Sequence, residues 1–275
     1  DNNSTAVQGL GGDDTATETF TVAVSDGSTQ KITITLNGTE DGAVIGGATT
    51  EDLIGAVTED AVDTAGDPAL TATGQLTISD ADAGENVDFN GVNVTAVAGA
   101  DGSVPTGSLE VAPNGIWTYT AGNSSDAVQS LGEGDQLTET FTVTTADGTG
   151  TQQITITITG TNDIPTIGGT TSGDIIEDDA GALSTGGQLT IDDADAGESS
   201  FVAGDQTVGT GTFSVDASGN WTFAADNNAI QSLGEGDQLT ETFTVTSADG
   251  STQNVEVTIT GTNDIPTIGG TTSGD

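Results

Sequence analysis

Apolar residues alternate with threonine along several short segments of this chain. Residues 141–145 read Phe-Thr-Val-Thr-Thr, and residues 154–159 read Ile-Thr-Ile-Thr-Ile-Thr. A period of two in β-branched residues is typical of antiparallel strands with one buried face. Gly, Asn and Asp, which favour turns, punctuate these segments. The pattern predicts about seven short strands per ~100 residues, and therefore an all-β, Ig-like sandwich with Greek-key connections.

The strand pattern recurs along the chain. AVQSLGEGDQLTETFTVTTADG at 127–148 returns as AIQSLGEGDQLTETFTVTSADG at 229–250, and a weaker copy occupies 6–27. Each copy leads into a second shared block, such as TITITGTNDIP. We therefore predict tandem sandwiches joined end to end in a rod. Their expected boundaries are the C-terminal part of one repeat at 1–41, a complete repeat with loop insertions at 42–164, a complete repeat at 165–266 and the start of another at 267–275.

Two features within the repeats bear on the core and on binding. Trp117 and Trp221 lie on alternating strands where the large side chain would point inward, so we expect core residues, not sugar-binding platforms. The middle repeat is longer, and its additional residues at 86–108 are interpreted as a loop insertion.

The charge balance is strongly acidic, with 43 acidic residues against a single base, Lys31, and a net charge of −42. Nucleic-acid phosphates and anionic membrane surfaces both require basic residues, so neither is an expected partner. The chain has no His and no Cys, which excludes imidazole bases, thiolate nucleophiles and zinc sites of the N/S type. Oxygen-ligated cations such as Ca²⁺ remain compatible with this composition. No apolar run approaches the ~20 residues of a membrane span, and the N-terminus is not a signal peptide, so we expect any export signal outside these residues.

A subset of the acids recurs near the ends of the predicted strands. Each complete repeat has an early Glu, a D-x-D turn after an early strand, a G-E-G-D turn, an Asp after the T-F-T-V strand and an acidic linker. Two Asp residues spaced in this way in a turn can bind one cation. We predict that Ca²⁺ is bound at the junctions between domains, where the linker of one repeat meets the D-x-D turn of the next. The candidate ligands are Glu40, Asp41, Glu59, Asp80, Asp82, Glu133, Asp135, Asp147, Asn162, Asp163, Glu177, Asp193, Asp195, Glu198, Glu235, Asp237, Asp249, Asn263 and Asp264.

These motifs resemble a known family. TETFTVTSADG followed by VTITGTNDIP is similar to the VCBS repeat, a bacterial extracellular module found in long arrays in RTX-type adhesins exported by type I secretion. The chain also resembles the cadherin repeat, whose junction motifs are an early Glu, D-A-D, an Asp after the aromatic strand and an N-D-N-x-P linker. The positions that match this pattern are Glu59 and Glu177, Asp80-Ala81-Asp82 and Asp193-Ala194-Asp195, Asp147 and Asp249, and Asn162-Asp163 and Asn263-Asp264.

The resemblance implies a spacer that holds an adhesive tip away from a bacterial cell surface, in support of cell adhesion or biofilm formation. Its partners would be neighbouring repeats of the same chain and other copies in a fibre. The first linker, TEDGA at 39–43, has Glu40 in place of Asn and no Pro. We expect that junction to bind calcium less tightly or to bend more.

Three other functions are compatible with parts of the sequence. Carboxylate pairs can hydrolyse glycosides, but a catalytic pair is unique to one cleft and these acids are repeated, so we predict that the chain is not an enzyme. A carbohydrate- or ligand-binding adhesive domain would use the 86–108 insertion. A subunit of a self-assembling extracellular matrix filament is the third alternative. The acids themselves have two further interpretations, as solvated turn residues or as an adaptation to high salt.

Overall fold

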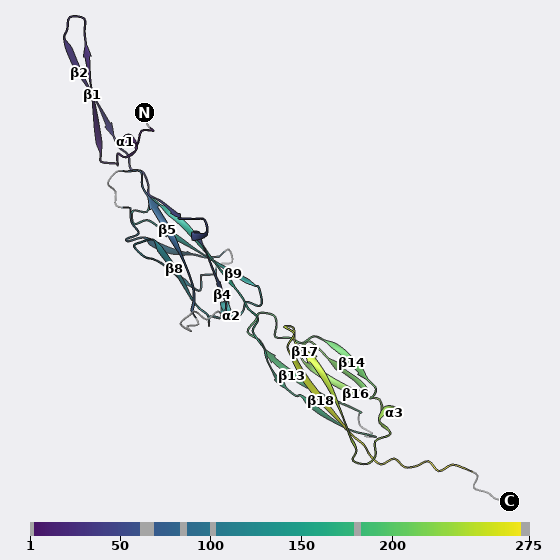
Figure 1. Cartoon of the computed structure of the whole chain (residues 1–275). Helices are drawn as coiled ribbons and strands as arrows, with labels where there is room; N and C mark the ends of the chain where they lie inside the picture. Colours follow the sequence, from purple (N-terminus) through teal and green to yellow (C-terminus); the bar gives the residue numbers. More distant parts are fainter. Residues whose placement is uncertain (1–2, 61–68, 83–86, 100–102, 179–182, 271–275) are drawn as a thin grey trace, which may run out of the picture. The chain divides into compact units, whose positions relative to one another are not determined.

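The computed structural model describes residues 3–60, 69–82, 87–99, 103–178 and 183–270. The chain divides into two compact units, unit 1 at Asp1–Thr161 and unit 2 at Asn162–Asp275. Each unit is described by itself (Figure 1). None of the helices in the described residues has the length and hydrophobicity needed to cross a bilayer.

Unit 1 is built from strands, with three short helical turns among the described residues. Its elements are α1 (Thr5–Gln8), β1 (Thr15–Ala23), β2 (Thr29–Asn37), β3 (Val44–Gly47), η1 (Glu51–Leu53), β4 (Ile54–Thr58), β5 (Ala69–Ser79), β6 (Asn93–Val97), β7 (Ser108–Val111), β8 (Ile116–Gly122), α2 (Asp126–Gln129), β9 (Gln136–Thr144) and β10 (Thr151–Thr159).

Two four-stranded sheets of unit 1 enclose a core, in the orders β4-β10-β9-β6 and β3-β5-β8-β7. Strand β4 runs parallel to β10, and the other pairs are antiparallel. The core contains Trp117 and Tyr119 of β8 and Phe141 of β9, all at most 2% exposed. The buried face of each strand is the one that the alternation predicts, because a strand turns successive side chains to opposite faces.

Trp117 shows how a sequence motif makes room for a core side chain. Its indole Nε1 donates to the Asp52 carbonyl at 2.7 Å. A Cβ at Gly74, the glycine of the GQLTI motif, would lie 2.6 Å from the indole ring. In unit 2 the equivalent Trp221 is 1% exposed and donates to the Thr170 carbonyl at 2.7 Å. Both tryptophans are therefore core residues, as predicted.

Unit 2 repeats this plan with one change in strand order. Its sheets have the orders β12-β18-β17 and β11-β13-β16-β15-β14. Its elements are β11 (Thr166–Gly169), β12 (Ser172–Ile176), β13 (Ser184–Asp192), β14 (Gly204–Val208), β15 (Gly211–Val215), β16 (Asn220–Ala225), α3 (Asn227–Ile230), β17 (Gln238–Thr246) and β18 (Thr252–Thr260). The core again centres on aromatic rings, with Phe213 and Phe243 stacked at 4.6 Å between ring centroids.

The all-β sandwich prediction is confirmed, but the structure corrects two details. The first strand of each repeat is split in two, so the predicted seven strands become eight. Strand β3 pairs with β5 and β4 pairs with β10, and β11 and β12 divide between the two sheets of unit 2 in the same way. The interpretation of 86–108 as a loop insertion is also wrong in part, because Asn93–Val97 form strand β6 and pair with β9.

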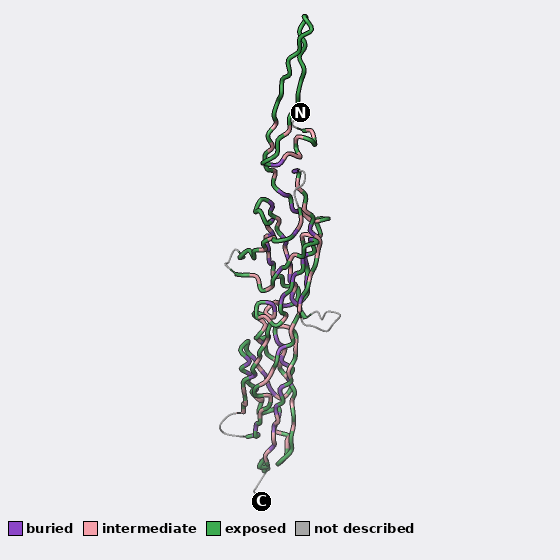
Figure 2. The backbone as a smooth tube through the Cα atoms, turned by 90° about the vertical axis from the view of Figure 1, so that its left-hand side faces the viewer, coloured by how far each residue is buried: buried purple, intermediate pink, exposed green. Residues whose placement is uncertain are grey.

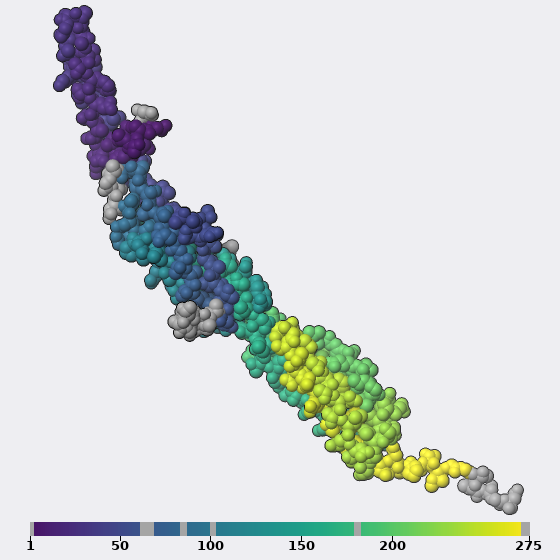
Figure 3. Space-filling view, viewed as in Figure 1, coloured from purple at the N-terminus to yellow at the C-terminus, as the bar shows by residue number. Residues whose placement is uncertain are grey.

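The β1–β2 hairpin carries the same sequence pattern as β9–β10 but has an exposed apolar face. Phe20 and Ile32 are 50% and 49% exposed, whereas the equivalent Phe141 and Ile154 are 2% and 0% exposed. Figure 2 shows almost the whole hairpin as exposed, and Figure 3 shows no described residues over it on the face in view. The described residues therefore place no second sheet against the apolar face of this hairpin.

Candidate calcium-binding site

The D-x-D turn of unit 2 directly follows β13 and holds a buried carboxylate. Asp195 is 2% exposed, and its main-chain N–H donates to Asp193 Oδ1 at 3.1 Å. Asp195 Oδ2 accepts the N–H of Asp163, in the linker, at 2.9 Å. Among the described residues, no hydrogen-bond donor reaches the buried atoms Asp195 Oδ1 and Asp193 Oδ2.

Unit 1 has the same arrangement at its own D-x-D turn. Asp82 is 5% exposed, its N–H donates to Asp80 Oδ1 at 3.0 Å, and its Oδ2 accepts the N–H of Asp41 at 2.8 Å. No donor from the described part of the chain reaches the buried Asp82 Oδ1. A Cβ placed on Gly11 would lie 3.7 Å from Asp82 Cγ, so the loop before β1 packs against this turn. The D-x-D turns of the two units therefore arrange their carboxylates in the same way.

These oxygens fit a hard cation. A buried charged oxygen without a donor is unfavourable, and the chain has no His and only one base to neutralise it. Carboxylate and carbonyl oxygens are the ligands that Ca²⁺ prefers. If Ca²⁺ is bound, Asp80 and Asp82 in unit 1 and Asp193 and Asp195 in unit 2 are the residues that would hold it.

The structure brings the Asp after the T-F-T-V strand near the D-x-D turn of unit 1. Asp80, Asp88 and Asp147 line one pocket of about 180 Å³, together with Asn90 and Thr145. The Thr145 hydroxyl donates to Asp147 Oδ1, and with the bonds from Thr149 it lowers the pKa of Asp147 to about 2. Asp147 is therefore ionised at neutral pH and available to a cation. Asp88 was not among the predicted ligands, because its DFNG segment has no counterpart in the other repeat.

The equivalent Asp249 of unit 2 is held in a similar turn. Burial opposes its ionisation, but hydrogen bonds from the Ser247 and Ser251 hydroxyls, together with the Ser251 N–H, lower the pKa of Asp249. Its carboxylate is therefore also charged at neutral pH.

The early glutamates accept hydrogen bonds from the residues that follow the last strand of each repeat. Glu59 is 1% exposed; its Oε1 accepts from Gln129 Nε2 at 2.7 Å, and its Oε2 accepts the N–H of Thr161 at 3.2 Å. Glu177 does the same with Gln231 at 3.3 Å and with the N–H of Thr262 at 3.0 Å. The two glutamines were not predicted, although their recurrence in AVQSLGEGD and AIQSLGEGD was a usable signal.

The remaining acidic candidates are exposed turn residues or contact the D-x-D turn through the main chain. Glu133, Asp135, Glu235 and Asp237 are exposed in the G-E-G-D turns, and Asp237 Oδ2 accepts the N–H of Gly234 in its own turn at 3.0 Å. Glu198 is half-buried, and its N–H donates to the Asp195 carbonyl at 3.3 Å.

The side chains of the other linker candidates make different contacts. Glu40 Oε2 accepts the N–H of Gly12 at 3.3 Å. The Asn162 and Asn263 amides donate to the carbonyls of the next residues, Asp163 and Asp264, at 2.8 and 3.2 Å. Within the described ranges, no three acidic side chains come close enough together to form a metal cluster. The ligand set therefore remains a prediction.

Comparison with known proteins places one repeat in a described family. Residues 162–261 match the family model of a bacterial cadherin-like domain. This confirms the cadherin-like character expected of that repeat, and the match indicates no enzyme family. None of the curated proteins matches the chain.

Solved structures of tandem cadherin domains are also similar. Protocadherin Gamma B2 extracellular cadherin domains 3–6 are 13% identical, with a TM-score of 0.43, over 90% of this chain and 57% of that chain. The Protocadherin GammaB4 extracellular domain is 13% identical, with a TM-score of 0.44, over 89% and 42%. Mouse Cadherin-23 EC22–24 is 16% identical, with a TM-score of 0.40, over 91% and 74%. The chain thus spans about half the length of the first of these structures. The assignment of a sandwich fold is based on the strand pairing within this chain.

Proposed function

We propose that this chain is a series of extracellular spacer repeats from a bacterial surface adhesin, stiffened by Ca²⁺ bound where linkers meet D-x-D turns. The matched family describes an adhesion-type repeat for residues 162–261. The VCBS-like motifs support the context of a secreted RTX-type adhesin that promotes cell adhesion or biofilm formation. The neighbouring repeats of the same chain are its first partners, and other copies of the chain in a fibre are its further partners.

One observation carries the proposal. In each unit a buried Asp uses one carboxylate oxygen to hold a linker N–H, while its other oxygen meets no donor among the described residues. A cation on the second oxygen would fix the side chain that already holds the linker. Binding and stiffening would therefore be coupled through a single residue, Asp82 in unit 1 and Asp195 in unit 2.

The linker between the two complete repeats is held at two amides. The N–H of Thr161 donates to Glu59 within unit 1, and the N–H of Asp163 donates to Asp195 within unit 2. Only Asn162 separates these two residues in the chain. Pro165 follows shortly afterwards and restricts the backbone further. A linker this short and this constrained needs little additional ordering to become rigid.

The first experiment compares thermal unfolding of the whole chain in CaCl₂, in MgCl₂ and in EGTA at constant ionic strength. Extracellular calcium modules typically bind at ~10⁻⁴–10⁻³ M, so millimolar calcium should raise the melting temperature. Magnesium should have a smaller effect, because it prefers stricter octahedral geometry and keeps its waters. Equal melting in all three conditions would show that the acids serve only as a soluble surface.

A second measurement tests stiffening separately. The chain has no Cys, so Thr118→Cys and Thr222→Cys give two unique spin-label positions, both exposed and on equivalent strands of the two units. We expect calcium to narrow the distance distribution between the labels. Binding without narrowing would assign the cation to stability within each repeat and contradict the spacer mechanism.

A further inference from the structure

Strands β9 and β17 have the same nine-residue sequence, QLTETFTVT, but different neighbours. Strand β9 lies between β10 and β6. Strand β17 pairs with β18 on one side, and the described residues place no strand on the other side beyond a single bridge between Phe201 and Ser247. One sequence therefore forms a central strand in unit 1 and an edge strand in unit 2.

Connection length explains this difference. Strand β14 is joined to β15 by only Gly209 and Thr210, a tight hairpin that keeps β14 in the sheet of β15. In unit 1, residues 98–107 separate β6 from β7. That longer connection allows β6 to cross to the opposite sheet and pair with β9 in the register Asn93↔Thr144 to Val97↔Thr140.

The unpaired edge of β17 presents main-chain groups at Thr242 and Thr244. The N–H of Ser247 points to the side of β18 and donates to the carbonyl of Ser251, the residue just before that strand. The Thr246 carbonyl points the other way and accepts the N–H of Val202 at 2.8 Å. Because main-chain direction alternates along a strand, the groups of Thr244 and Thr242 face the same open side. In the part of the chain that the structure describes, a side chain covers the Thr244 carbonyl, since Gln206 Nε2 donates to it at 2.8 Å.

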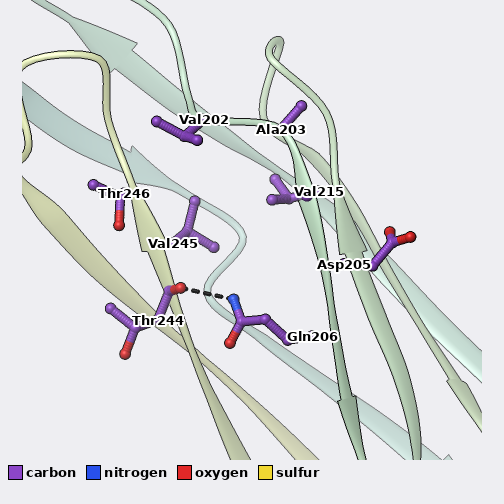
Figure 4. Close-up of a pocket in the computed structure, with 9 residues that line it drawn as sticks. Val202, Ala203, Asp205, Gln206, Val215, Thr244, Val245 and Thr246 are labelled. Carbon is purple, nitrogen blue, oxygen red and sulfur yellow. Dashed lines mark hydrogen bonds between the residues drawn. The ribbon is translucent and has the colours of Figure 1, made fainter.

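A pocket with both apolar and polar lining residues lies beside this edge. It has a volume of about 180 Å³, and Figure 4 shows the side chains of Val202, Val215 and Val245 around it, with the Gln206–Thr244 hydrogen bond at one end. Val245 and Val215 are 1% and 8% exposed, so the pocket opens directly onto the core. In unit 1, Val94 of β6 lies opposite Val143 and packs on the core there.

We propose that the Thr242–Thr244 edge of β17 is a docking site for an extended, uncharged strand of a separate polypeptide. The strand would run antiparallel to β17, in the register that β6 adopts on the identical β9, with a branched apolar residue at the position of Val94 entering the pocket. Such strand addition to an open sheet edge gives affinity through main-chain bonds and specificity through alternate side chains.

Charge limits what this strand can be. The chain carries a net charge of −42, and Asp205 lines the pocket, so an acidic strand would be repelled. Residues 92–98 read VNVTAVA and contain no charge. The segment that pairs with this sequence in unit 1 therefore has the expected chemistry, and a synthetic peptide of residues 92–98 is a suitable probe.

Gln206 acts as a cover on the site, because an incoming main-chain N–H must displace its amide from the Thr244 carbonyl. Gln206→Ala should therefore bind the peptide more tightly, by about fivefold, the equivalent of one neutral hydrogen bond. Thr242→Pro should weaken binding by about five- to tenfold. Proline is tolerated on the open side of an edge strand, because the N–H it removes has no ladder partner.

The test uses the whole chain and follows backbone amide signals by NMR during titration with the 92–98 peptide. We expect shifts at Thr242 and Thr244 and slower hydrogen exchange there. A peptide carrying Val94→Asp should not bind. Thr140→Pro, the matched change in β9, should destabilise unit 1 because β6 pairs with Thr140, but should leave peptide binding to unit 2 unchanged.

Three results would overturn the proposal. No shift at the β17 amides, in either the unaltered chain or Gln206→Ala, would show that the edge does not accept a strand. Equal binding by Thr242→Pro would place the peptide elsewhere. Self-association of the chain without peptide, abolished by Thr242→Pro, would assign the edge to a second copy and overturn the choice of a separate partner. Because Gln206→Ala is expected to act in the opposite direction, the test does not depend on the folding of the proline variant.

Discussion

Replacing Asp195 by Asn should stabilise unit 2 in the absence of calcium and remove most of its stabilisation by calcium. Asp195 is 2% exposed and has an oxygen that no donor reaches among the described residues. Without a cation, the buried charge is unfavourable, and Asp193 next to it adds repulsion. Asparagine keeps an oxygen for the N–H of Asp163 but removes the charge. We therefore expect Asp195→Asn to stabilise unit 2 in EGTA.

The two magnitudes are comparable, so the advantage of the variant in EGTA should largely disappear in calcium. A buried group left without its partner costs roughly 1–3 kcal/mol, which sets the scale of the gain in EGTA. At ~5 mM calcium and a dissociation constant of ~10⁻⁴–10⁻³ M, binding stabilises the native state by about 1–2 kcal/mol. The unaltered chain should gain this amount, and Asp195→Asn should gain close to none.

The assay is urea unfolding followed by tryptophan fluorescence. The chain has two tryptophans, one in each unit, so a Trp117→Phe background leaves Trp221 as the reporter of unit 2. Asp205→Asn is the matched control, since Asp205 is an exposed acid of the same unit and undergoes the same change of charge. It should keep the full calcium response.

Two outcomes would refute the reasoning. Full calcium stabilisation in Asp195→Asn would remove Asp195 from the site. Equal destabilisation in calcium and in EGTA would show that the carboxylate is needed only for its hydrogen bond to the linker.

Three further predictions concern unit 1. Tyr119 is fully buried, and its hydroxyl donates to Glu139 Oε2 at 2.8 Å. Tyr119→Phe should therefore lower the free energy of unfolding of unit 1 by about 1.5–3 kcal/mol, measured by urea unfolding with Trp117 as the reporter in a Trp221→Phe background. A loss below ~0.5 kcal/mol would contradict this. Burial, with Glu139, raises the pKa of Tyr119 above its usual ~10. The unfolded chain therefore ionises first, and unit 1 should lose stability as pH rises above about 10; tyrosinate absorbance, which reports Tyr119 alone because it is the one Tyr, should appear only with unfolding. The Asp147 pKa of about 2 implies that its carboxylate stabilises unit 1 above the unfolded pKa of about 4, and that this contribution is lost as pH falls toward 2. Asp147→Asn should therefore make the melting temperature of unit 1 depend less on pH across that range. The same pH dependence in the variant and in the unaltered chain would count against this.

Much of the fold could be predicted because it is encoded locally. The alternation in QLTETFTVT and in the following strand fixes both the strands and the face they bury, and the short turn between them fixes their register. The positions of Trp117 and Trp221 followed from the same alternation.

The choice of which of the two sheets a strand joins was not encoded in this way. Whether Asn93–Val97 joins one sheet or the other depends on the length of the connection to β7 and on space beside β9. Neither is visible in the period of the sequence. For the same reason, the split of the first strand into β3 and β4 was missed.

The candidate site was predictable in position but not in detail. The D-x-D and linker motifs placed Asp195 and Asp163 near one another because both flank strand ends, and the structure joins them by a hydrogen bond. The pairing of Glu59 with Gln129 depends on contact between residues far apart in sequence. No spacing rule contains that information.

The identity of β9 and β17 also has a consequence for folding fidelity. Neighbouring repeats that share a strand sequence risk pairing with each other's strands, a characteristic failure of repeat proteins. Here each copy of QLTETFTVT is followed, after the short turns at 145–150 and 247–251, by its own partner strand β10 or β18. Because nearby contacts form faster than distant ones, each hairpin should close before the other repeat can compete. The order of strands along the chain thus protects a repetitive sequence from mispairing.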